Sequence, residues 1–364
     1  MKLGIVGLPN VGKSTLFSAV TKMKAEIANY PFCTIEPNIG IVAVPDKRLD
    51  VLNEMYEAKK VTPAIIEFVD IAGLVEGAAE GKGLGNKFLS HIREVDVIVH
   101  VVRCFYNNDI IHVSGGIGPA NDIAVVETEL MLSDLEILKR RIEKVEKSLK
   151  ADKKYKKEAE VLEKIKEFIE SGNVAREFIA SEAEQEILNT IPLLSAKPVV
   201  YVANLLEEDF KTEINNNELF KEVCLIAKNE NTVTIPISAR LEEEISEFSE
   251  SERKIFFADL NREESGIDVL IKISYSLLGL ISFLTAGKQE VRAWTIKKGV
   301  TAKEAAGKIH TDMEKGFIKA EIVSYANLIS CGGMGQAKEK GLIKLEGKDY
   351  IMQDGDVVLF RFNV

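Results

Sequence analysis

Apolar and polar positions alternate along the first third of the chain in a way that predicts strands followed by helices. Short runs rich in Val and Ile predict buried strands, and the segment that begins at Lys13 has helical spacing. The strand pattern returns after residue 195. Alternating strands and helices are typical of an α/β domain with a mostly parallel sheet and flanking helices. The predicted strands are residues 3–6, 39–44, 64–69, 97–102, 198–204 and 233–238.

The segment between these strands has a different period. Its apolar residues recur at spacings of three and four in a background of Lys and Glu, which is typical of a coiled-coil seam. The lysine-rich run 151–157 interrupts the seam, and the spacing then resumes. We therefore expect an antiparallel coiled-coil hairpin inserted at residues 125–195, and a monomer, because one chain satisfies the seam. The seam residues are Leu135, Leu138, Ile142, Val145, Leu149, Leu162, Ile165 and Ile169.

The C-terminal quarter shows a third pattern, in which short strands and Gly-containing turns predict a small α+β domain. It follows the apolar stretch 269–284, which polar residues interrupt and which is too short to span a membrane. A buried helix is expected there, and no membrane association. The predicted organisation is a first domain at residues 1–278, interrupted by the hairpin at 125–195, and a second domain at residues 279–364.

Charge limits the partners. The net charge of −10 argues against broad non-specific binding to nucleic acid, because such binding depends on neutralising phosphates. Residues 279–364 nevertheless hold 13 Lys and Arg against 10 Asp and Glu, so an RNA contact is expected to use this end of the chain. The lysine-rich turn 151–157 is either a further RNA contact or a solvated surface.

The cysteines and the N-terminus bear on the compartment. Four cysteines lie far apart without a CxxC pair, which favours free thiols in a reducing compartment. The chain runs directly from Met1 into the first predicted strand, which leaves no room for the apolar core of a signal peptide. Both features predict a cytoplasmic protein.

The segment from Gly7 to Ser14 has the pattern of a phosphate-binding P-loop between a strand and a helix. Glycines let backbone N–H groups close around phosphate oxygens, Lys13 reaches the β and γ phosphates, and the Ser14 hydroxyl binds Mg²⁺. The chain is therefore predicted to hydrolyse a nucleoside triphosphate with Mg²⁺. The predicted phosphate-binding residues are Asn10, Val11, Gly12, Lys13, Ser14 and Thr15.

Two further segments complete the predicted phosphate site. Asp70 follows the strand 64–69, where its carboxylate can hold the Mg²⁺ shell through water, and Gly73 can offer its N–H to the γ phosphate. Thr34 can ligate Mg²⁺ only when a γ phosphate is present, as in a switch loop that senses hydrolysis. Taken alone, Thr34 could equally be a turn residue.

The base site is predicted at the ends of two later strands, at Asn204, Leu205, Glu207 and Ser238. A guanine pocket uses Asn-Lys-x-Asp, whose Asp accepts from the guanine N1 and N2 donors. Here the Lys is lost and Glu207 replaces the Asp. A carboxylate aimed at adenine N1 would repel that acceptor, whereas a longer or redirected Glu removes the guanine contact, so ATP is favoured over GTP.

These motifs resemble the YchF/Ola1 subfamily of Obg-related P-loop NTPases over the whole chain. The resemblance implies a P-loop G domain, an inserted coiled coil, a β-grasp-like TGS domain at the C-terminus and a preference for ATP over GTP. It also implies association with the ribosome, in particular the large subunit, and RNA contacts through the coiled coil and the TGS domain. The segments that carry it are residues 7–14, 30–38, 70–74, 204–207, 285–295, 345–350 and 353–364.

The resemblance also implies roles for single residues. Leu205 contacts the base by its backbone, and Phe105 lines the adenine pocket, unless it is a core residue. Asn10 matches a position that helps to hold K⁺ in potassium-activated relatives, the alternative being a loop-stabilising Asn. His112 resembles a histidine proposed to be catalytic, although an isolated His is more often structural. Leu74 stands where Ras-like proteins place a water-orienting Gln, so slow intrinsic turnover is expected.

Three functions remain open at this point. The first is an ATPase switch whose nucleotide state controls ribosome or RNA binding. The second is an Obg-type GTPase, against which only residues 204–207 argue. The third is a ribosome-binding adaptor that uses ATP mainly as a structural ligand, which Leu74 makes plausible.

Overall fold

The computed structural model describes residues 1–22, 38–71, 84–107, 118–260 and 262–363. Within these ranges the chain forms two compact units. The first contains residues 1–42 and 67–269, and the second contains residues 43–66 and 270–364.

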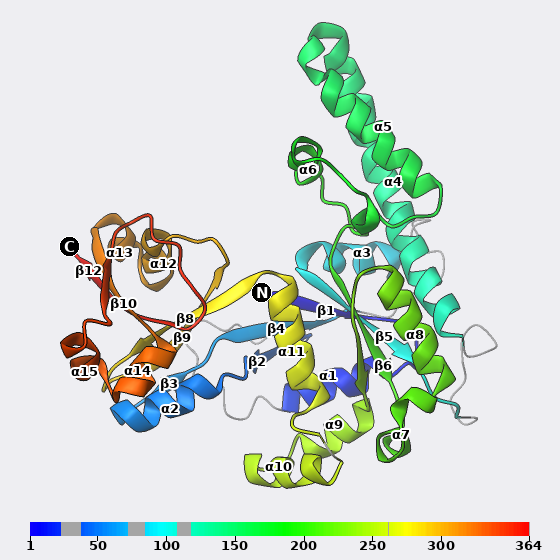
Figure 1. Ribbon diagram of the computed structural model, residues 1–364. Coiled ribbons are helices and arrows are strands. Elements are labelled where there is room, and N and C mark those ends of the chain that lie inside the picture. The colour runs from blue at the N-terminus through cyan, green and yellow to red at the C-terminus, as the bar shows by residue number, and fades with distance from the viewer. Residues whose placement is uncertain (23–37, 72–83, 108–117, 261, 364) are drawn as a thin grey trace. The chain divides into compact units, whose positions relative to one another are not determined.

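The first unit is built on a six-stranded sheet in the order β2-β4-β1-β5-β6-β7 (Figure 1). The pairs from β4 to β7 are all parallel, as predicted from the strand-helix alternation. Every residue of β5 and β6 is buried, which explains their continuous apolar sequences. The strands are β1 (Lys2–Val6), β2 (Ile39–Ala43), β4 (Ile65–Asp70), β5 (Val97–Arg103), β6 (Val199–Asn204) and β7 (Thr234–Ile237).

Helices connect these strands. The helix predicted from Lys13 is α1 (Lys13–Lys22), whose buried face contains Leu16, Ala19 and Val20. Helix α11 (Gly266–Leu277) leads out of this part of the chain. The others are α3 (Leu84–Glu94), α4 (Pro119–Ala151), α5 (Lys156–Glu170), α6 (Glu182–Leu188), α7 (Glu207–Lys211), α8 (Glu218–Asn229), α9 (Ala239–Ile245) and α10 (Glu250–Asp259).

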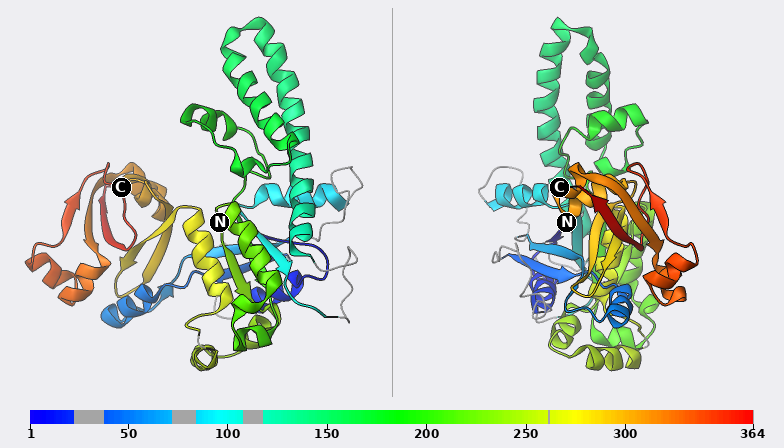
Figure 2. Two further views of the ribbon diagram at one scale, coloured as in Figure 1. Left: turned by 45° about the vertical axis from the view of Figure 1, so that its right-hand side comes forward. Right: turned by 90° about the vertical axis from the view of Figure 1, so that its left-hand side faces the viewer.

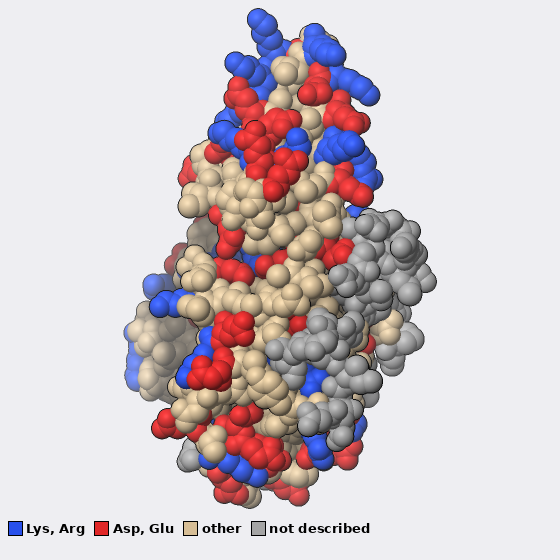
Figure 3. Space-filling model, turned by 90° about the vertical axis from the view of Figure 1, so that its right-hand side faces the viewer, with Lys and Arg blue, Asp and Glu red and all other residues tan. Residues whose placement is uncertain are grey.

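Helices α4 and α5 form the predicted antiparallel hairpin, and Figure 2 shows them side by side. Leu138, Leu162 and Ile165 have no exposed surface in its core. Asp134 fixes the returning chain, because its carboxylate accepts from the backbone N–H groups of Leu194 at 2.6 Å and Ser195 at 2.8 Å. Lys and Arg side chains crowd the far end of the hairpin (Figure 3).

The second unit has its own six-stranded sheet, in the order β11-β10-β12-β8-β9-β3. Phe283, Ile322 and Phe360 belong to its core. Its elements are α2 (Lys47–Tyr56), β3 (Val61–Thr62), β8 (Leu280–Ala286), β9 (Val291–Lys297), α12 (Ala302–Ile309), α13 (Thr311–Lys315), β10 (Phe317–Ser324), α14 (Tyr325–Cys331), α15 (Met334–Glu339), β11 (Lys344–Glu346) and β12 (Asp356–Phe362).

Residues 43–66 depart from the predicted domain division, which assigned them to the first domain. They belong to the second unit, where Val61 pairs with Val291 in a parallel register. The Arg48 guanidinium also donates to the Asp354 carboxylate at 2.7 Å. Nothing in the local pattern of a helix and a two-residue strand reveals which sheet they join, so the sequence could not show this.

The predicted buried helix at residues 269–284 is also only half correct. Helix α11 ends at Leu277, and Gly279 has a φ of +60°, which turns the chain into β8. The prediction of a helix up to residue 284 was wrong because a short apolar run fits a buried strand as well as a helix. In the described ranges, no helix combines the length and the apolar character needed to cross a bilayer.

Candidate nucleotide site

The predicted site residues gather at the carboxyl edge of the first sheet. Asp70, at the end of β4, is the register partner of Ile5 on β1, two residues before the loop 7–14. Asn204, at the end of β6, is the register partner of both Arg103 on β5 and Ile237 on β7. In open α/β sheets, ligands bind in the crevice outside this edge.

The glycines of the loop are required by its close contacts. Gly7 has a φ of 149°, and a β-carbon there would stand 2.5 Å from the Val101 carbonyl oxygen. Gly12 has a φ of 102°, and a β-carbon there would overlap Asn204 Nδ2. Asn10 also lies in the left-handed region, at a φ of 64°, which Asn tolerates better than most residues. The loop therefore has a fixed backbone shape.

Lys13 and Asp70 are partly buried and interact electrostatically. Burial lowers the pKa of Lys13 although the Asp70 carboxylate opposes this shift. Burial likewise raises the pKa of Asp70 although the Lys13 ammonium opposes it. Because desolvation prevails for both groups, neither is fully compensated by the other. Ser14 is exposed and Thr15 is partly buried on the first turn of α1, beside this pair.

The Asn204 side chain, at the end of β6, is hydrogen-bonded to the loop that follows β1 and to the helix that follows β7. Its side-chain amide donates to the Val11 carbonyl at 2.8 Å, and its Oδ1 accepts from the Ala239 N–H at 3.0 Å. The neighbouring Leu205 is 2% exposed, and its N–H donates to the Ile237 carbonyl at 2.8 Å. Asn204 therefore ties the P-loop to the start of α9.

The remaining predicted base-site residues have defined contacts. Glu207 begins α7, and its carboxylate accepts from Lys211 Nζ at 2.7 Å in a partly exposed ion pair. Ser238 is buried, and its hydroxyl accepts from the Leu241 N–H at 3.4 Å as the cap of α9. Phe105 is partly buried just beyond β5, beneath the guanidinium of Arg103. Thr34, Gly73 and His112 lie outside the described residues.

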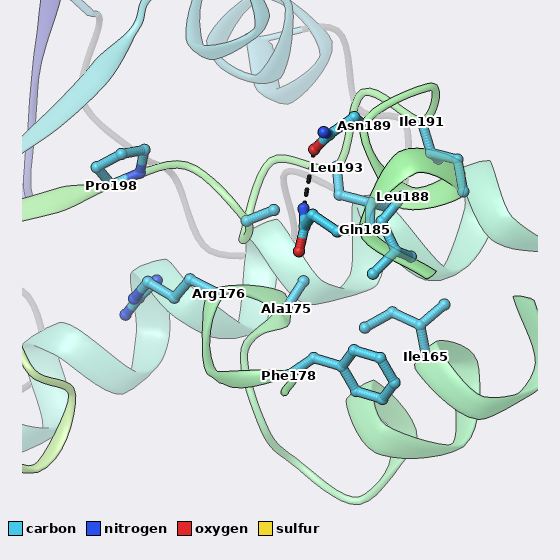
Figure 4. A pocket seen from close by; sticks show the side chains of 11 residues that line it. Ile165, Ala175, Arg176, Phe178, Gln185, Leu188, Asn189, Ile191, Leu193 and Pro198 are labelled. Carbon is cyan, nitrogen blue, oxygen red and sulfur yellow. Dashed lines mark hydrogen bonds between the residues drawn. The ribbon is translucent and has the colours of Figure 1, made fainter. Parts of the chain in front are cut away.

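A separate cavity of about 500 Å³ lies at the base of the hairpin (Figure 4). None of the predicted nucleotide-binding residues lines it. Arg176 does, and its guanidinium pairs with Glu127 and with Glu230, the latter at 2.6 Å. Sequence reasoning missed these partly buried ion pairs, because their members are far apart in the chain. The other polar lining residues are Gln185 and Asn189, whose side-chain amides are hydrogen-bonded at 2.8 Å.

A parallel sheet with a P-loop at its carboxyl edge defines a P-loop NTPase of the G-domain type. Residues 2–149 match the family MMR_HSR1, described as a 50S ribosome-binding GTPase. Residues 280–363 match the family YchF-GTPase_C, described as a protein of unknown function (DUF933). This chain belongs to the YchF family.

Similar proteins cover the whole chain. A Bacillus subtilis protein named "Ribosome-binding ATPase YchF" is 52% identical over 99% of both chains. A Haemophilus influenzae protein of the same name is 50% identical over 100% of this chain and 99% of its own. The structure of the Schizosaccharomyces pombe YchF GTPase is 39% identical, with a TM-score of 0.90 over 99% of this chain and 97% of that one.

Proposed function

We propose that this protein is a ribosome-associated regulatory ATPase that binds and slowly hydrolyses ATP, and that its nucleotide state controls its association with the ribosome. The observation that carries the proposal is the partly buried pair formed by Lys13 of the P-loop and Asp70 at the sheet edge. The names of full-length relatives support both the ATPase activity and the ribosome as partner. Because ribosomes are the partner, the proposal includes a cytoplasmic location.

The donor groups fit Mg²⁺. Asp70 is a partly dehydrated carboxylate whose desolvation Lys13 does not fully offset, and Ser14 offers an exposed hydroxyl. Oxygen donors of this kind are the ligands that Mg²⁺ prefers. In the proposal Ser14 holds the ion directly and Asp70 holds it through water, with Thr34 joining when a γ phosphate is present. Bound Mg²⁺ would neutralise phosphate charge, and Lys13 binds the β and γ phosphates.

ATP rather than GTP is the proposed nucleotide. The Glu207 carboxylate is engaged by Lys211 Nζ at 2.7 Å, which supports the view that it does not serve as a guanine acceptor. In the proposal, the Leu205 backbone contacts the base and Phe105 forms part of the adenine pocket. Asn204 and Ser238 support the base site through their hydrogen bonds to the loop and to α9. Asn10 would hold K⁺. Gly73 would donate its N–H to the γ phosphate, and His112 would take part in hydrolysis.

Titration calorimetry with ATP and GTP tests the nucleotide assignment. The measurement is made with Mg²⁺, in K⁺ and then in Na⁺. Tighter binding of ATP than of GTP is expected. The rate of ATP hydrolysis, measured separately, is expected to be higher in K⁺ than in Na⁺. Tighter binding of GTP would contradict the adenine assignment, and equal rates in K⁺ and Na⁺ would remove the proposed role of Asn10. Sedimentation with isolated ribosomal subunits completes the test, with the monomeric protein expected on the large subunit.

We further propose that the far end of the hairpin contacts ribosomal RNA. Residues 147–157 contain six Lys and one Asp, a net charge of +5, and all six lysines are exposed. Such a cluster on a chain of net charge −10 fits the phosphate backbone. Among the residues that the structure describes, acidic partners lie within ion-pair distance of Lys154 and Lys156 alone, namely Asp152 and Glu160.

Charge reversal tests this contact. The variant with Lys147, Lys153 and Lys157 changed to Glu is expected to lose ribosome affinity, most strongly at low salt. The control changes Lys139, Lys221 and Lys228 to Glu, which alters the net charge equally at exposed positions nearer the sheet. Equal ribosome affinities for the two variants would contradict an RNA contact at the tip.

A further inference from the structure

Arg103 is an unusual residue for the end of a buried strand. It is the largest described side chain with essentially no exposed surface. Burial lowers the pKa of the Arg103 guanidinium, and the carboxylate of Asp122 opposes this shift. A hydrophobic residue of similar volume would fill the space without the cost of desolvating a charge. A buried arginine here therefore calls for a role that its shape or charge serves.

The contacts of the guanidinium show what it supports. Arg103 Nε donates to the Phe105 carbonyl at 3.2 Å, and Nη2 donates to the Asn107 carbonyl at 3.0 Å. Its central carbon lies 4.7 Å from the centre of the Phe105 ring. Residues 105–107 thus curl around one planar group that binds both their carbonyls and an aromatic face.

The intervening residue is fixed as well. The Cys104 N–H donates to the Asn204 carbonyl at 2.9 Å, and the Cys104 carbonyl accepts from Asn217 Nδ2 at 3.0 Å. Arg103 itself is the register partner of Asn204. The loop that starts at Cys104 is therefore built on the same strand end that carries the P-loop contact of Asn204.

We infer that Arg103 is a positioning residue for the nucleotide base: its guanidinium holds Phe105 and the backbone of residues 105–107 as one wall of the base pocket. This inference rests on the proposed function, because it takes Phe105 as part of that pocket. Asp122, in the first turn of α4, interacts electrostatically with the guanidinium. The phosphate-binding loop makes none of these contacts.

The variant Arg103→Lys tests the inference. Lysine keeps the charge opposite Asp122 but loses the planar fork and its stacking. Binding of ATP and of inorganic triphosphate is measured by calorimetry, both with Mg²⁺. ATP affinity is expected to fall by about tenfold, because a cation–π contact and hydrogen bonds to two carbonyls are weakened. Triphosphate affinity is expected to stay unchanged, since that ligand has no base.

Arg176→Lys is the matched control. Arg176 is also a mostly buried arginine with acidic partners, but it lies at the hairpin base. It is expected to lower thermal stability as Arg103→Lys does, while leaving the affinities for both ligands unchanged. An Arg103→Lys variant that loses both ligands equally, or neither, would overturn the inference.

A double-mutant cycle gives a second readout. If Arg103 acts through Phe105, then Arg103→Lys and Phe105→Leu together should cost less ATP affinity than the sum of the single changes. Additive losses would overturn the inference. A wild-type preference for GTP would contradict the adenine assignment alone, because the same cycle measured with GTP still decides whether Arg103 positions the base wall.

Discussion

The side-chain amide of Asn204, the last residue of β6, donates to the main-chain carbonyl of Val11 across 2.8 Å, so this strand end is hydrogen-bonded directly to the P-loop. The same side chain accepts from the N–H of Ala239. One 6%-exposed amide therefore uses both its donor and its acceptor on backbone groups from two distant segments.

Asn204→Ala is expected to weaken ATP binding and to lower the free energy of unfolding by about 2 kcal/mol, because it leaves two backbone groups without their partner. Calorimetry and urea denaturation measure these effects. Asn189→Ala is the control, since Asn189 is exposed and its side chain bonds only Gln185 among the described contacts. An Asn204→Ala protein with unchanged ATP affinity would remove the link between the base strand and the loop.

Lys13→Ala is expected to reduce ATP hydrolysis by about 100-fold or more, because in the proposed site Lys13 supplies the positive charge that stabilises the transferred phosphate. Phosphate release measures the rate. Thermal stability should change little, since the substitution also removes a desolvated ammonium. Lys22→Ala, at the other end of α1 in exposed ion pairs with Glu243 and Glu247, should keep the wild-type rate. Comparable rates for the two variants would refute the assignment of the loop.

Glu242 should make stability depend on pH. Burial raises the pKa of this 4%-exposed carboxyl to about 7, even though the Gly266 N–H donates to it at 2.6 Å. The folded protein thus binds the proton more tightly than the unfolded chain does. The free energy of unfolding is expected to fall as pH rises from about 4.5 to about 7.

Glu242→Gln should flatten this dependence and raise the free energy of unfolding at pH 8 by roughly 2 kcal/mol, with little gain at pH 4.5. Urea denaturation across this pH range is the measurement. Glu244→Gln, on the exposed side of α9, is the matched control. A Glu242→Gln protein with wild-type stability at every pH would show that folding does not raise the pKa of this carboxyl.

Leu162→Ala should lower the free energy of unfolding of the hairpin by about 2–5 kcal/mol, because Leu162 has no exposed surface in the hairpin core. Amide hydrogen exchange would show faster exchange in α4 and α5. Ribosome binding is expected to weaken while ATP affinity stays unchanged, because the predicted nucleotide-binding residues lie at the carboxyl edge of the sheet and not in the hairpin. Ile179→Ala provides the comparison, since Ile179 is 95% exposed. Loss of ATP affinity in Leu162→Ala would contradict this separation.

The elements that could be predicted from the sequence depend on local pattern. The P-loop combines a strand, glycines and Lys13 within a dozen residues, and the seam of the hairpin repeats at short spacing. The contact between Asn204 and Val11 spans 193 residues, and the ion pair between Arg176 and Glu230 spans 54. Such pairs depend on which strands become neighbours, and a single sequence does not specify that locally.

Arg103 shows the same limit more sharply. In the sequence Arg103 is the last residue of an apolar run, and a charged residue at the end of a strand is ordinarily expected to be exposed. Its burial follows from the loop that curls over it, held by carbonyls that any residue could supply. The sequence therefore gives little warning of the two carbonyl contacts, and only the aromatic ring of Phe105 depends on side-chain identity.

The membership of residues 43–66 in the second unit has a consequence for synthesis. These residues leave the ribosome early, yet the rest of their unit begins at residue 270, 204 residues after residue 66. At a translation rate of about 5–20 residues per second, strand β3 waits roughly 10–40 s for β9. During that interval residues 67–269 of the first unit are synthesised and can begin to fold. The nascent chain thus completes its second unit last, around a segment that it made among the first.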